Sequence, residues 1–341
     1  MRIFISVASI VVSDIQKMCQ TAVFYGEALA RYGFGGSHPF GTDRLDAFWN
    51  KLQSESIGNI VVEEPVMAGY QDAVLFHDSA YVELVKVASR HGGVLLDKGD
   101  TPAFKGAFEA SLYVVGSTLA ALDMVMTGRD SEKRKVDHAF NPIGGLHHAR
   151  RDSAGGFCIF NDIGIVILAA REKYRIKRIA YIDIDAHHGD GVFYEFEDDP
   201  LLFFADIHED GRYLYPGTGS AGEIGKGAAA RTKLNISLEP GAGDGEFIEA
   251  FGKIEHFVDN VKPELIILQC GADGLAGDPI THLQYTSKAH MFAAGSIHRL
   301  AHKHCNGRII ALGGGGYNRT NISDAWTEVV RSLAVDTDFR Q

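Results

Sequence analysis

Residues 182–191, IDIDAHHGDG, gather three carboxylates and two imidazoles within eight positions. The largely apolar residues 178–181 before them indicate a buried strand, so the polar run begins where that strand leaves its sheet. Charged groups at such a position must be paired or bound to a metal. Asp185 and His187 have an Asp-x-His spacing that lets both side chains converge on one cation. The run therefore predicts half of a metal site.

Two other segments end strands with side chains of suitable chemistry. Residues 141–148, NPIGGLHH, end in His147 and His148, and residues 269–273, QCGAD, end in Asp273. Asp183 and Asp190 are the natural carboxylates to orient two imidazoles by hydrogen bonding. Asp273 offers a third metal ligand, although an isolated Asp after Gly-Ala more often caps a helix. A lone histidine is usually solvated or satisfied in the core, whereas a tandem pair after a glycine-rich strand end is less often so.

The last strand is followed by residues 313–318, GGGGYN. Four glycines could cradle a phosphate, but neither the GxxxxGK pattern of a P-loop nor GxGxxG is present. The informative residue is Tyr317, a phenol on a glycine-flanked turn beside the predicted site. Phe157, in residues 155–158 (GGFC), and Tyr215, in residues 214–219 (LYPGTG), could wall a narrow channel. Either aromatic alone would more often belong to the core.

The elements that must position these residues alternate along the chain. Apolar runs predict a first strand at 21–25 and further strands at 136–141, 176–185, 201–208, 233–238, 265–270 and 308–312. Helical patterns cover 104–126, 161–174, 245–261, 287–304 and 322–333. Several strands are almost continuous in Ile, Leu, Val and Phe, as parallel strands covered on both faces are. The alternation predicts βαβ units in a three-layer α/β/α sandwich with a central parallel sheet.

The composition is that of an ordinary globular chain, with 341 residues, 45% hydrophobic residues and 23% charged residues. A net charge of -11 argues against direct nucleic-acid binding and membrane binding, and it leaves room for a cationic substrate. Without a linker or composition break, we expect one catalytic domain over 21–341 after an N-terminal extension, 1–20, of uncertain role. Residues 1–12 resemble a short signal peptide but lack a persuasive cleavage site. The sequence does not define the oligomeric state and is compatible with a homo-oligomer.

Four cysteines, Cys19, Cys158, Cys270 and Cys305, are scattered without a CxxC motif. This usage indicates reduced thiols, so we expect a cytoplasmic protein. No run of the sequence approaches the roughly 20 consecutive apolar residues of a membrane span.

Taken together, the motifs resemble those of the zinc-dependent deacetylases of the histone deacetylase superfamily, most closely the bacterial acetoin-utilisation type. The matching segments are 35–39, 144–148, 155–158, 183–191, 215–219, 271–273 and 313–318. They follow the family's order and cover residues 21–334. The resemblance implies an arginase-like fold and hydrolysis of N-acetyl-lysine in proteins or peptides.

The resemblance also implies roles for individual residues. Asp185, His187 and Asp273 would hold Zn²⁺, leaving coordination open for water and the substrate carbonyl. His148, oriented by Asp190, would be general base and acid, and His147, oriented by Asp183, would assist electrostatically. Tyr317 would donate to the oxyanion. The substrate-binding residues implied are Gly156 and Phe157 with Tyr215 along an acyl-lysine tunnel, Ile280 near its floor or rim, and Asp100 at its mouth. Arg44 matches an arginine near an internal acetate exit, and His188 is expected to be a buried support residue.

Two positions depart from the family pattern. Asp206 stands where relatives commonly carry a Ser that helps bind a structural K⁺, so the resemblance leaves the potassium site open. Tyr215 replaces a more usual Phe and adds a hydroxyl to the channel wall, which puts acyl preference in doubt.

Three other functions are compatible with parts of the pattern. A two-metal ureohydrolase of arginase type would need more carboxylates, but positions 189 and 275 hold Gly and Leu. A deacetylase of acetylated polyamines or other small acylated amines would use the same chemistry and differ only at the rim. A non-catalytic acyl-lysine reader is disfavoured because every expected ligand, base and oxyanion donor is present.

Overall fold

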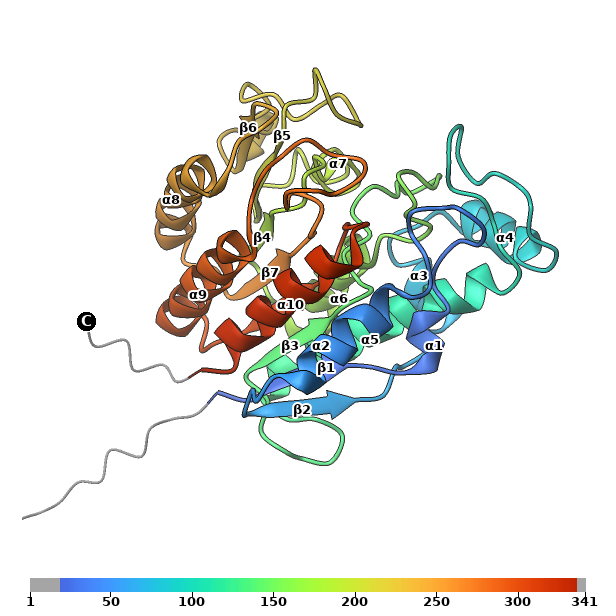
Figure 1. Cartoon of the computed structure of the whole chain (residues 1–341), viewed down its shortest axis with the longest axis horizontal. Coiled ribbons are helices and arrows are strands. Elements are labelled where there is room, and N and C mark those ends of the chain that lie inside the picture. The colour runs from blue at the N-terminus through green and yellow to red at the C-terminus, as the bar shows by residue number, and fades with distance from the viewer. Residues whose placement is uncertain (1–18, 336–341) are drawn as a thin grey trace, which may run out of the picture.

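The computed structural model describes residues 19–335, so most of the segment predicted as an N-terminal extension lies outside the described residues. One eight-stranded sheet runs through the molecule in the order β2-β1-β3-β8-β7-β4-β5-β6 (Figure 1). Every pairing in it is parallel. The strands are β1 (Thr21–Phe24), β2 (Ile60–Glu63), β3 (His138–Asn141), β4 (Ile179–Asp183), β5 (Leu202–Glu209), β6 (Lys233–Leu238), β7 (Leu265–Gln269) and β8 (Ile309–Leu312).

The central strands are buried along their whole length, as their apolar sequences predict. All residues of β3, β8, β7 and β4 are buried. The strand predicted over 176–185 is shorter: β4 ends at Asp183, which pairs with Asp206 on β5 and Gln269 on β7. Asp185 therefore lies on the loop. The edge strand β2 was not predicted, because only four residues form it and two of them are not buried.

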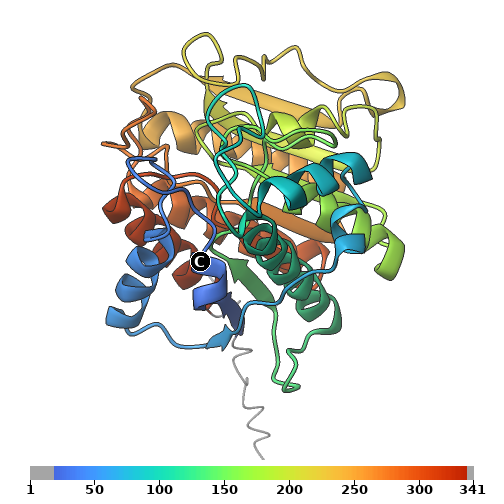
Figure 2. The same cartoon turned by 90° about the vertical axis from the view of Figure 1, so that its right-hand side faces the viewer.

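Helices cover both faces of the sheet, which confirms the predicted α/β/α arrangement (Figures 1 and 2). On one face α10 packs between α2 and α9, and α9 packs against α8; on the other, α5 packs against α6. The larger helices are α2 (Arg44–Ser54), α4 (Ser79–Ala88), α5 (Ala107–Thr127), α6 (Asp162–Tyr174), α8 (Asp244–Val261), α9 (Ser287–His304) and α10 (Arg319–Leu333). Within residues 19–335 the other helical segments are short: α1 (Glu27–Ala30), α3 (Tyr70–Ala73), α7 (Asp190–Phe193) and the 3₁₀ turn η1 (Gly227–Ala229).

Helix α5 is the most apolar helix of the fold. Among residues 19–335 it alone is long and apolar enough to cross a membrane by length and composition, but 67% of its apolar window is buried within the protein. Such burial is typical of a core helix. Its burial against α6 and β3 explains the composition without a membrane.

The order of the central strands decides where the chemistry lies. β3, β8, β7 and β4 are consecutive neighbours, and the polar segments of the sequence follow these four strands. Because all strands run parallel, the four segments leave the sheet at the same carboxyl edge, where α/β proteins build their sites. Four segments that are far apart in the sequence are thereby brought to one place.

Candidate metal centre and catalytic residues

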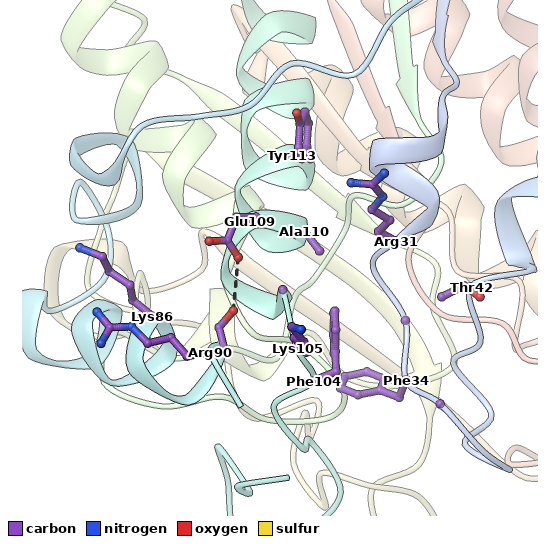
Figure 3. Close-up of a pocket in the computed structure, with 14 residues that line it drawn as sticks. Arg31, Phe34, Thr42, Lys86, Arg90, Phe104, Lys105, Glu109, Ala110 and Tyr113 are labelled. Carbon is purple, nitrogen blue, oxygen red and sulfur yellow. Dashed lines mark hydrogen bonds between the residues drawn. The ribbon is translucent and has the colours of Figure 1, made fainter. Parts of the chain in front are cut away.

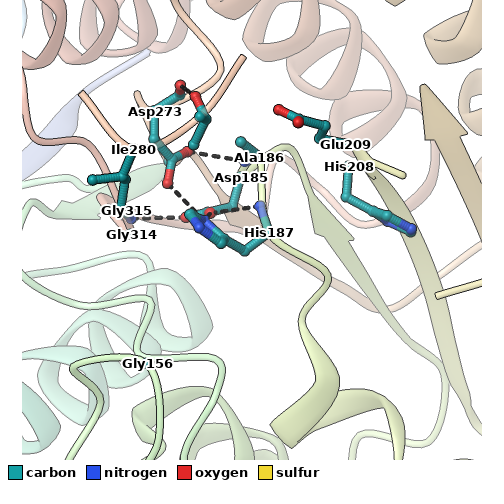
Figure 4. A network of polar contacts seen from close by, with 12 residues as sticks. Gly156, Asp185, Ala186, His187, His208, Glu209, Asp273, Ile280, Gly314 and Gly315 are labelled. Carbon is teal, nitrogen blue, oxygen red and sulfur yellow. Dashed lines mark hydrogen bonds and ion pairs between the residues drawn. The ribbon is translucent and has the colours of Figure 1, made fainter. Parts of the chain in front are cut away.

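Three predicted metal ligands meet at the carboxyl edge of β4 and β7. The Nδ1 atom of His187 lies 3.0 Å from Asp185 Oδ1 and 3.0 Å from Asp273 Oδ2 (Figure 4). All three side chains are buried, and their donor atoms lie within 4.8 Å of one another. The structure thus places one nitrogen and two carboxylate oxygens around a common point.

The surroundings fix these carboxylates in place. Asp185 Oδ2 accepts hydrogen bonds from Gln269 Nε2 at 2.7 Å and from the Gly315 backbone N–H at 2.8 Å. Asp273 Oδ1 accepts from the Ala186 N–H at 2.9 Å. A Cβ atom at Gly315 would overlap both carboxylates, so glycine is what lets the last loop approach them.

This donor set fits a catalytic zinc ion. Burial, together with the charge of Asp185, raises the pKa of Asp273 to about 7. Two buried carboxylates this close need a cation or a proton between them. Three N and O ligands with one side left open are the arrangement that distinguishes catalytic from structural zinc.

Next to the donor set lie two histidine–aspartate pairs. His147 Nδ1 is 2.8 Å from Asp183 Oδ2, and His148 Nδ1 is 2.7 Å from Asp190 Oδ1. The Tyr181 hydroxyl donates to Asp183 Oδ2. On the other pair, Arg150 Nη2 donates to Asp190 Oδ2 at 2.7 Å. Both imidazoles are therefore held with Nδ1 toward a carboxylate and Nε2 toward the site.

The two imidazoles differ in charge. Burial lowers the pKa of His147, but the carboxylates of Asp183 and Asp185 outweigh burial and raise it to about 9. For His148, burial and the neighbouring charge of His147 lower the pKa to about 4. At neutral pH His147 is thus protonated and His148 is neutral.

Gly156 allows a close approach to the second histidine. Its φ is +50°, and a Cβ atom there would overlap the His148 imidazole. The next residue, Phe157, is also in the left-handed region at φ +68°.

Two predicted aromatic residues, Phe157 and Tyr215, pack against residues of the candidate site. The Phe157 ring packs edge-on against Tyr317, with centroids 5.6 Å apart. Tyr215, half exposed, packs against His148 at 5.0 Å. Tyr317 lines the same small cavity, about 10 Å³, as His147, His148, Asp185 and His187. Burial and the carboxylates of Asp273 and Asp185 raise the pKa of Tyr317 well above 10, so its hydroxyl keeps its proton.

Three predicted residues lie outside the immediate centre. Asp100 is exposed on a loop, and its backbone carbonyl accepts a hydrogen bond from His38 Nε2 at 3.1 Å. The hydroxyl oxygen of the adjacent Thr101 accepts a hydrogen bond from the Phe157 N–H at 3.0 Å. Ile280 is partly buried on the loop after β7, beside Thr281, whose hydroxyl donates to the Asp273 carbonyl. Arg44 is fully buried and donates to the carbonyls of Gly314 and Gly316.

Two polar residues, one in the loop after β4 and one in β5, have hydrogen-bond partners outside the donor set. His188 is buried with Nδ1 2.8 Å from Thr218 Oγ1, so it is not a member of the set. Asp206 accepts from the Gly189 N–H at 2.8 Å and lies 2.7 Å from His208 Nδ1.

Three contributors were missed by sequence reasoning. Gln269 donates to the Asp185 carboxylate, and Arg150 donates to the Asp190 carboxylate. Asp162 accepts hydrogen bonds from the backbone N–H groups of Gly145 and Leu146, just before His147. A signal existed for the first two, because Gln269 ends the strand before Asp273 and Arg150 follows the histidine pair. Asp162 begins a helix and carries no such signal.

A much larger cavity lies away from the donor set. It measures about 850 Å³ and is lined by Phe34 and Phe104 together with basic side chains of α4 and the loop before α5, Lys86, Arg90 and Lys105 (Figure 3). None of the predicted metal or catalytic residues lines it.

The fold and this site define a class of hydrolase, and comparison with known proteins agrees. The family model for the histone deacetylase domain matches residues 38–333, so the chain belongs to the histone deacetylase family and is a deacetylase. It is 38% identical over 329 residues to the acetoin utilization protein AcuC of Bacillus subtilis, covering 93% of this chain and 81% of that protein.

Further relatives extend this finding. AcuC of Staphylococcus aureus strain MSSA476 is 34% identical, over 93% of this chain and 82% of its own. The chloroplastic histone deacetylase 14 of Arabidopsis thaliana is 32% identical, over 94% and 78% respectively. The crystal structure of the HDA15 HD domain superposes with a TM-score of 0.81 at 24% identity, covering 93% of this chain and 90% of that one, which shows the shared fold.

Proposed function

We propose that the protein hydrolyses the amide of N-acetyl-lysine in proteins or peptides and releases acetate, with Zn²⁺ held by Asp185, His187 and Asp273. One observation carries the proposal. The small cavity is lined at once by two of these ligands, by both histidines and by Tyr317. A ligand set, a proton acceptor and a hydroxyl donor facing one space are the parts that amide hydrolysis requires.

Zn²⁺, when bound, would lower the pKa of water from about 15.7 towards 7 and polarise the acetyl carbonyl. His148 accepts the proton from the attacking water, since it is neutral and its Nε2 faces the cavity. It then returns that proton to the lysine amine as the C–N bond breaks. Asp190 keeps the imidazole in the required orientation through Nδ1.

His147 and Tyr317 stabilise charge rather than transfer the water proton. His147, which Asp183 holds through Nδ1, assists electrostatically beside the reacting group. The Tyr317 hydroxyl donates to the oxygen that becomes negative as the acetyl carbonyl is attacked. A single donor of this kind is worth roughly 10²–10³ in kcat.

The same proposal assigns the path of the substrate. Gly156, Phe157 and Tyr215 flank the acyl-lysine side chain, Ile280 lies near the floor or rim of the tunnel, and Asp100 receives substrate backbone N–H groups at the mouth. The hydrogen bond from the Phe157 N–H to the Thr101 hydroxyl supports this path, because it connects the loop at the tunnel mouth to a residue of the tunnel wall. Arg44, buried against the last glycine loop, lines the exit of acetate.

A second candidate is the hydrolysis of small acylated amines such as acetylated polyamines. Burial raises the pKa of Tyr215, and the carboxylates of Asp190, Asp100 and Asp97 raise it further, so negative charge is gathered near the outer wall. Such charge favours a substrate with a second cationic amine.

Other properties follow as parts of the proposal. The catalytic domain comprises residues 21–341 and works in the cytoplasm on acetylated substrates, without direct nucleic-acid or membrane binding. The K⁺ site stays a prediction: Asp206 already has a backbone N–H and His208 as partners.

The test compares kcat/KM for acetyl-lysine peptides, longer acyl-lysine peptides and acetylputrescine, each with chelator and Zn²⁺ re-addition. We expect the acetyl-lysine peptide to give the highest value. A preference for acetylputrescine would replace the first candidate with the second. Release of urea from guanidino substrates with two bound Mn²⁺ ions would contradict both.

A further inference from the structure

A second group of metal-binding side chains lies at the opposite, amino edge of the sheet. Its members are Cys19, just before β1, His138, the first residue of β3, and His298 and His302, one turn apart on α9. Their candidate ligand atoms all lie within 4.8 Å of one another. The proposed deacetylase mechanism uses none of them.

The distances match the edges of a metal tetrahedron. His302 Nε2 lies 3.4 Å from His138 Nε2 and 3.3 Å from Cys19 Sγ. Two nitrogens bound to zinc at about 2.0–2.1 Å in tetrahedral geometry are roughly 3.4 Å apart, and a nitrogen and a thiolate sulfur roughly 3.6 Å apart. The remaining pairs of candidate ligand atoms lie within 4.8 Å of each other.

The backbone orients two of the rings for metal binding. His138 Nδ1 donates to the Gly307 carbonyl at 2.6 Å, and His298 Nδ1 donates to the Ser332 carbonyl at 3.0 Å. An imidazole with its proton on Nδ1 carries the lone pair on Nε2, which is how carbonyl partners prepare metal-binding histidines. The three rings stand edge to face, with centroids 4.7–5.3 Å apart, as rings around a common point do.

Three of the four candidate ligands are buried, and the fourth is partly exposed. Cys19, His138 and His298 are at most 1% exposed, whereas His302 is partly exposed and leaves a route for an ion. Gly307 has φ +80°, and a Cβ atom there would overlap the His302 ring.

We propose that Cys19, His138, His298 and His302 bind a structural Zn²⁺ ion. A thiolate with three imidazoles supplies four protein ligands and leaves no open position, which is the property that separates structural from catalytic zinc sites. The ion joins the segment before β1 to β3 and to the last turns of α9. It is independent of the proposed catalytic centre, whose donors contain no sulfur.

Cobalt(II) distinguishes the two centres, because only a thiolate ligand gives a sulfur-to-cobalt charge-transfer band in the near ultraviolet. The full chain is stripped with chelator, titrated with Co²⁺, and its metal content is counted. The same titration is made on Cys19→Ser, on the matched control Cys305→Ser, and on Asp185→Asn/Asp273→Asn. Cys305 is also a buried thiol at the end of α9, with Sγ 3.7 Å from the Arg308 carbonyl.

We expect the band in the wild type, in Cys305→Ser and in the Asp185→Asn/Asp273→Asn variant, which should retain one Co²⁺ per chain. Cys19→Ser should lose the band and one bound ion, and its melting temperature should fall less on chelation than that of the wild type. His302→Gln, at the partly exposed position, gives the same test if Cys19→Ser does not fold. Absence of the band in the wild type, or its survival in both ligand variants, overturns the proposal.

Discussion

His147 Nε2 lies 3.0 Å from His148 Nε2, while the Nδ1 atom of each ring faces a different carboxylate. With both Nδ1–H groups donating to carboxylates, the facing Nε2 atoms share one proton between them. The pKa values of about 9 for His147 and about 4 for His148 place that proton on His147. The pair is therefore singly protonated at neutral pH, with one charged ring and one ring ready to accept a proton.

Replacing Asp183 by Asn should move the alkaline limb of the pH profile. The Asp183 carboxylate raises the pKa of His147, so its neutralisation lowers that pKa, and His147 then loses its proton at a lower pH. We expect the alkaline limb of kcat/KM to shift down by roughly 1–3 pH units, the usual effect of one close opposite charge. Asp190→Asn is the comparison: it should lower kcat through His148 and leave the alkaline limb in place. If the alkaline limb of the kcat/KM profile stays at the same pH in Asp183→Asn, His147 has no role in the mechanism.

Tyr317→Phe should keep its metal and lose turnover. The hydroxyl is the expected donor to the developing oxyanion but is not one of the three metal ligands, so kcat should fall by roughly 10²–10³-fold. Steady-state kinetics and metal analysis on the same preparation check this. Tyr213→Phe, on an exposed side chain, serves as the control. Full activity in Tyr317→Phe contradicts the assignment.

Gly156→Ala should disturb His148 without touching the metal ligands. The new Cβ atom would overlap the imidazole, and φ is +50°. We expect kcat to fall by about tenfold or more, a barrier increase of at least about 1.4 kcal/mol. Gly252→Ala is a matched control in α8, where nothing lies within 4 Å of the added atom; it should retain activity and gain up to about 1 kcal/mol of stability. Equal kinetics for the two variants would show that His148 tolerates displacement.

Gly315→Ala should weaken metal binding at the catalytic centre. The added atom would overlap the carboxylates of Asp185 and Asp273, which must then move apart. We expect zinc to be removed from this variant at a lower chelator concentration than from the wild type, with activity lost in parallel. If Gly315→Ala resists the chelator as well as the wild type does, these carboxylates do not hold the ion.

The position of the site was predictable because of one property of parallel sheets. Polar residues that follow buried parallel strands lie at one edge of the sheet, which indicated a common site for Asp185, His187, Asp273 and the histidine pair. The resemblance to the deacetylase family supplied their roles. The predicted helices and central strands were confirmed for a related reason: their apolar patterns are long or continuous.

What escaped prediction depends on strand order and on single contacts. β2 is a short edge strand, and α2 and α4 lie in a region of mixed polarity. Gln269 reaches Asp185 only because β7 pairs with β4, a neighbour relation that the sequence does not encode locally. The cluster of Cys19 with three histidines was likewise not predicted. His298 and His302 have the i, i+4 spacing of metal-binding histidines on a helix, but Cys19 and His138 come from two other segments, and only the fold brings them together.

The central claim is that zinc held by Asp185, His187 and Asp273 is required for deacetylation. The most direct measurement is acetate release from an acetyl-lysine peptide by the wild type and by Asp273→Asn, each stripped with chelator and then titrated with Zn²⁺. We predict that the stripped wild type is inactive and recovers its rate as Zn²⁺ is added, while Asp273→Asn stays inactive throughout. Undiminished acetate release by the stripped protein, or full recovery by Asp273→Asn, would contradict the claim.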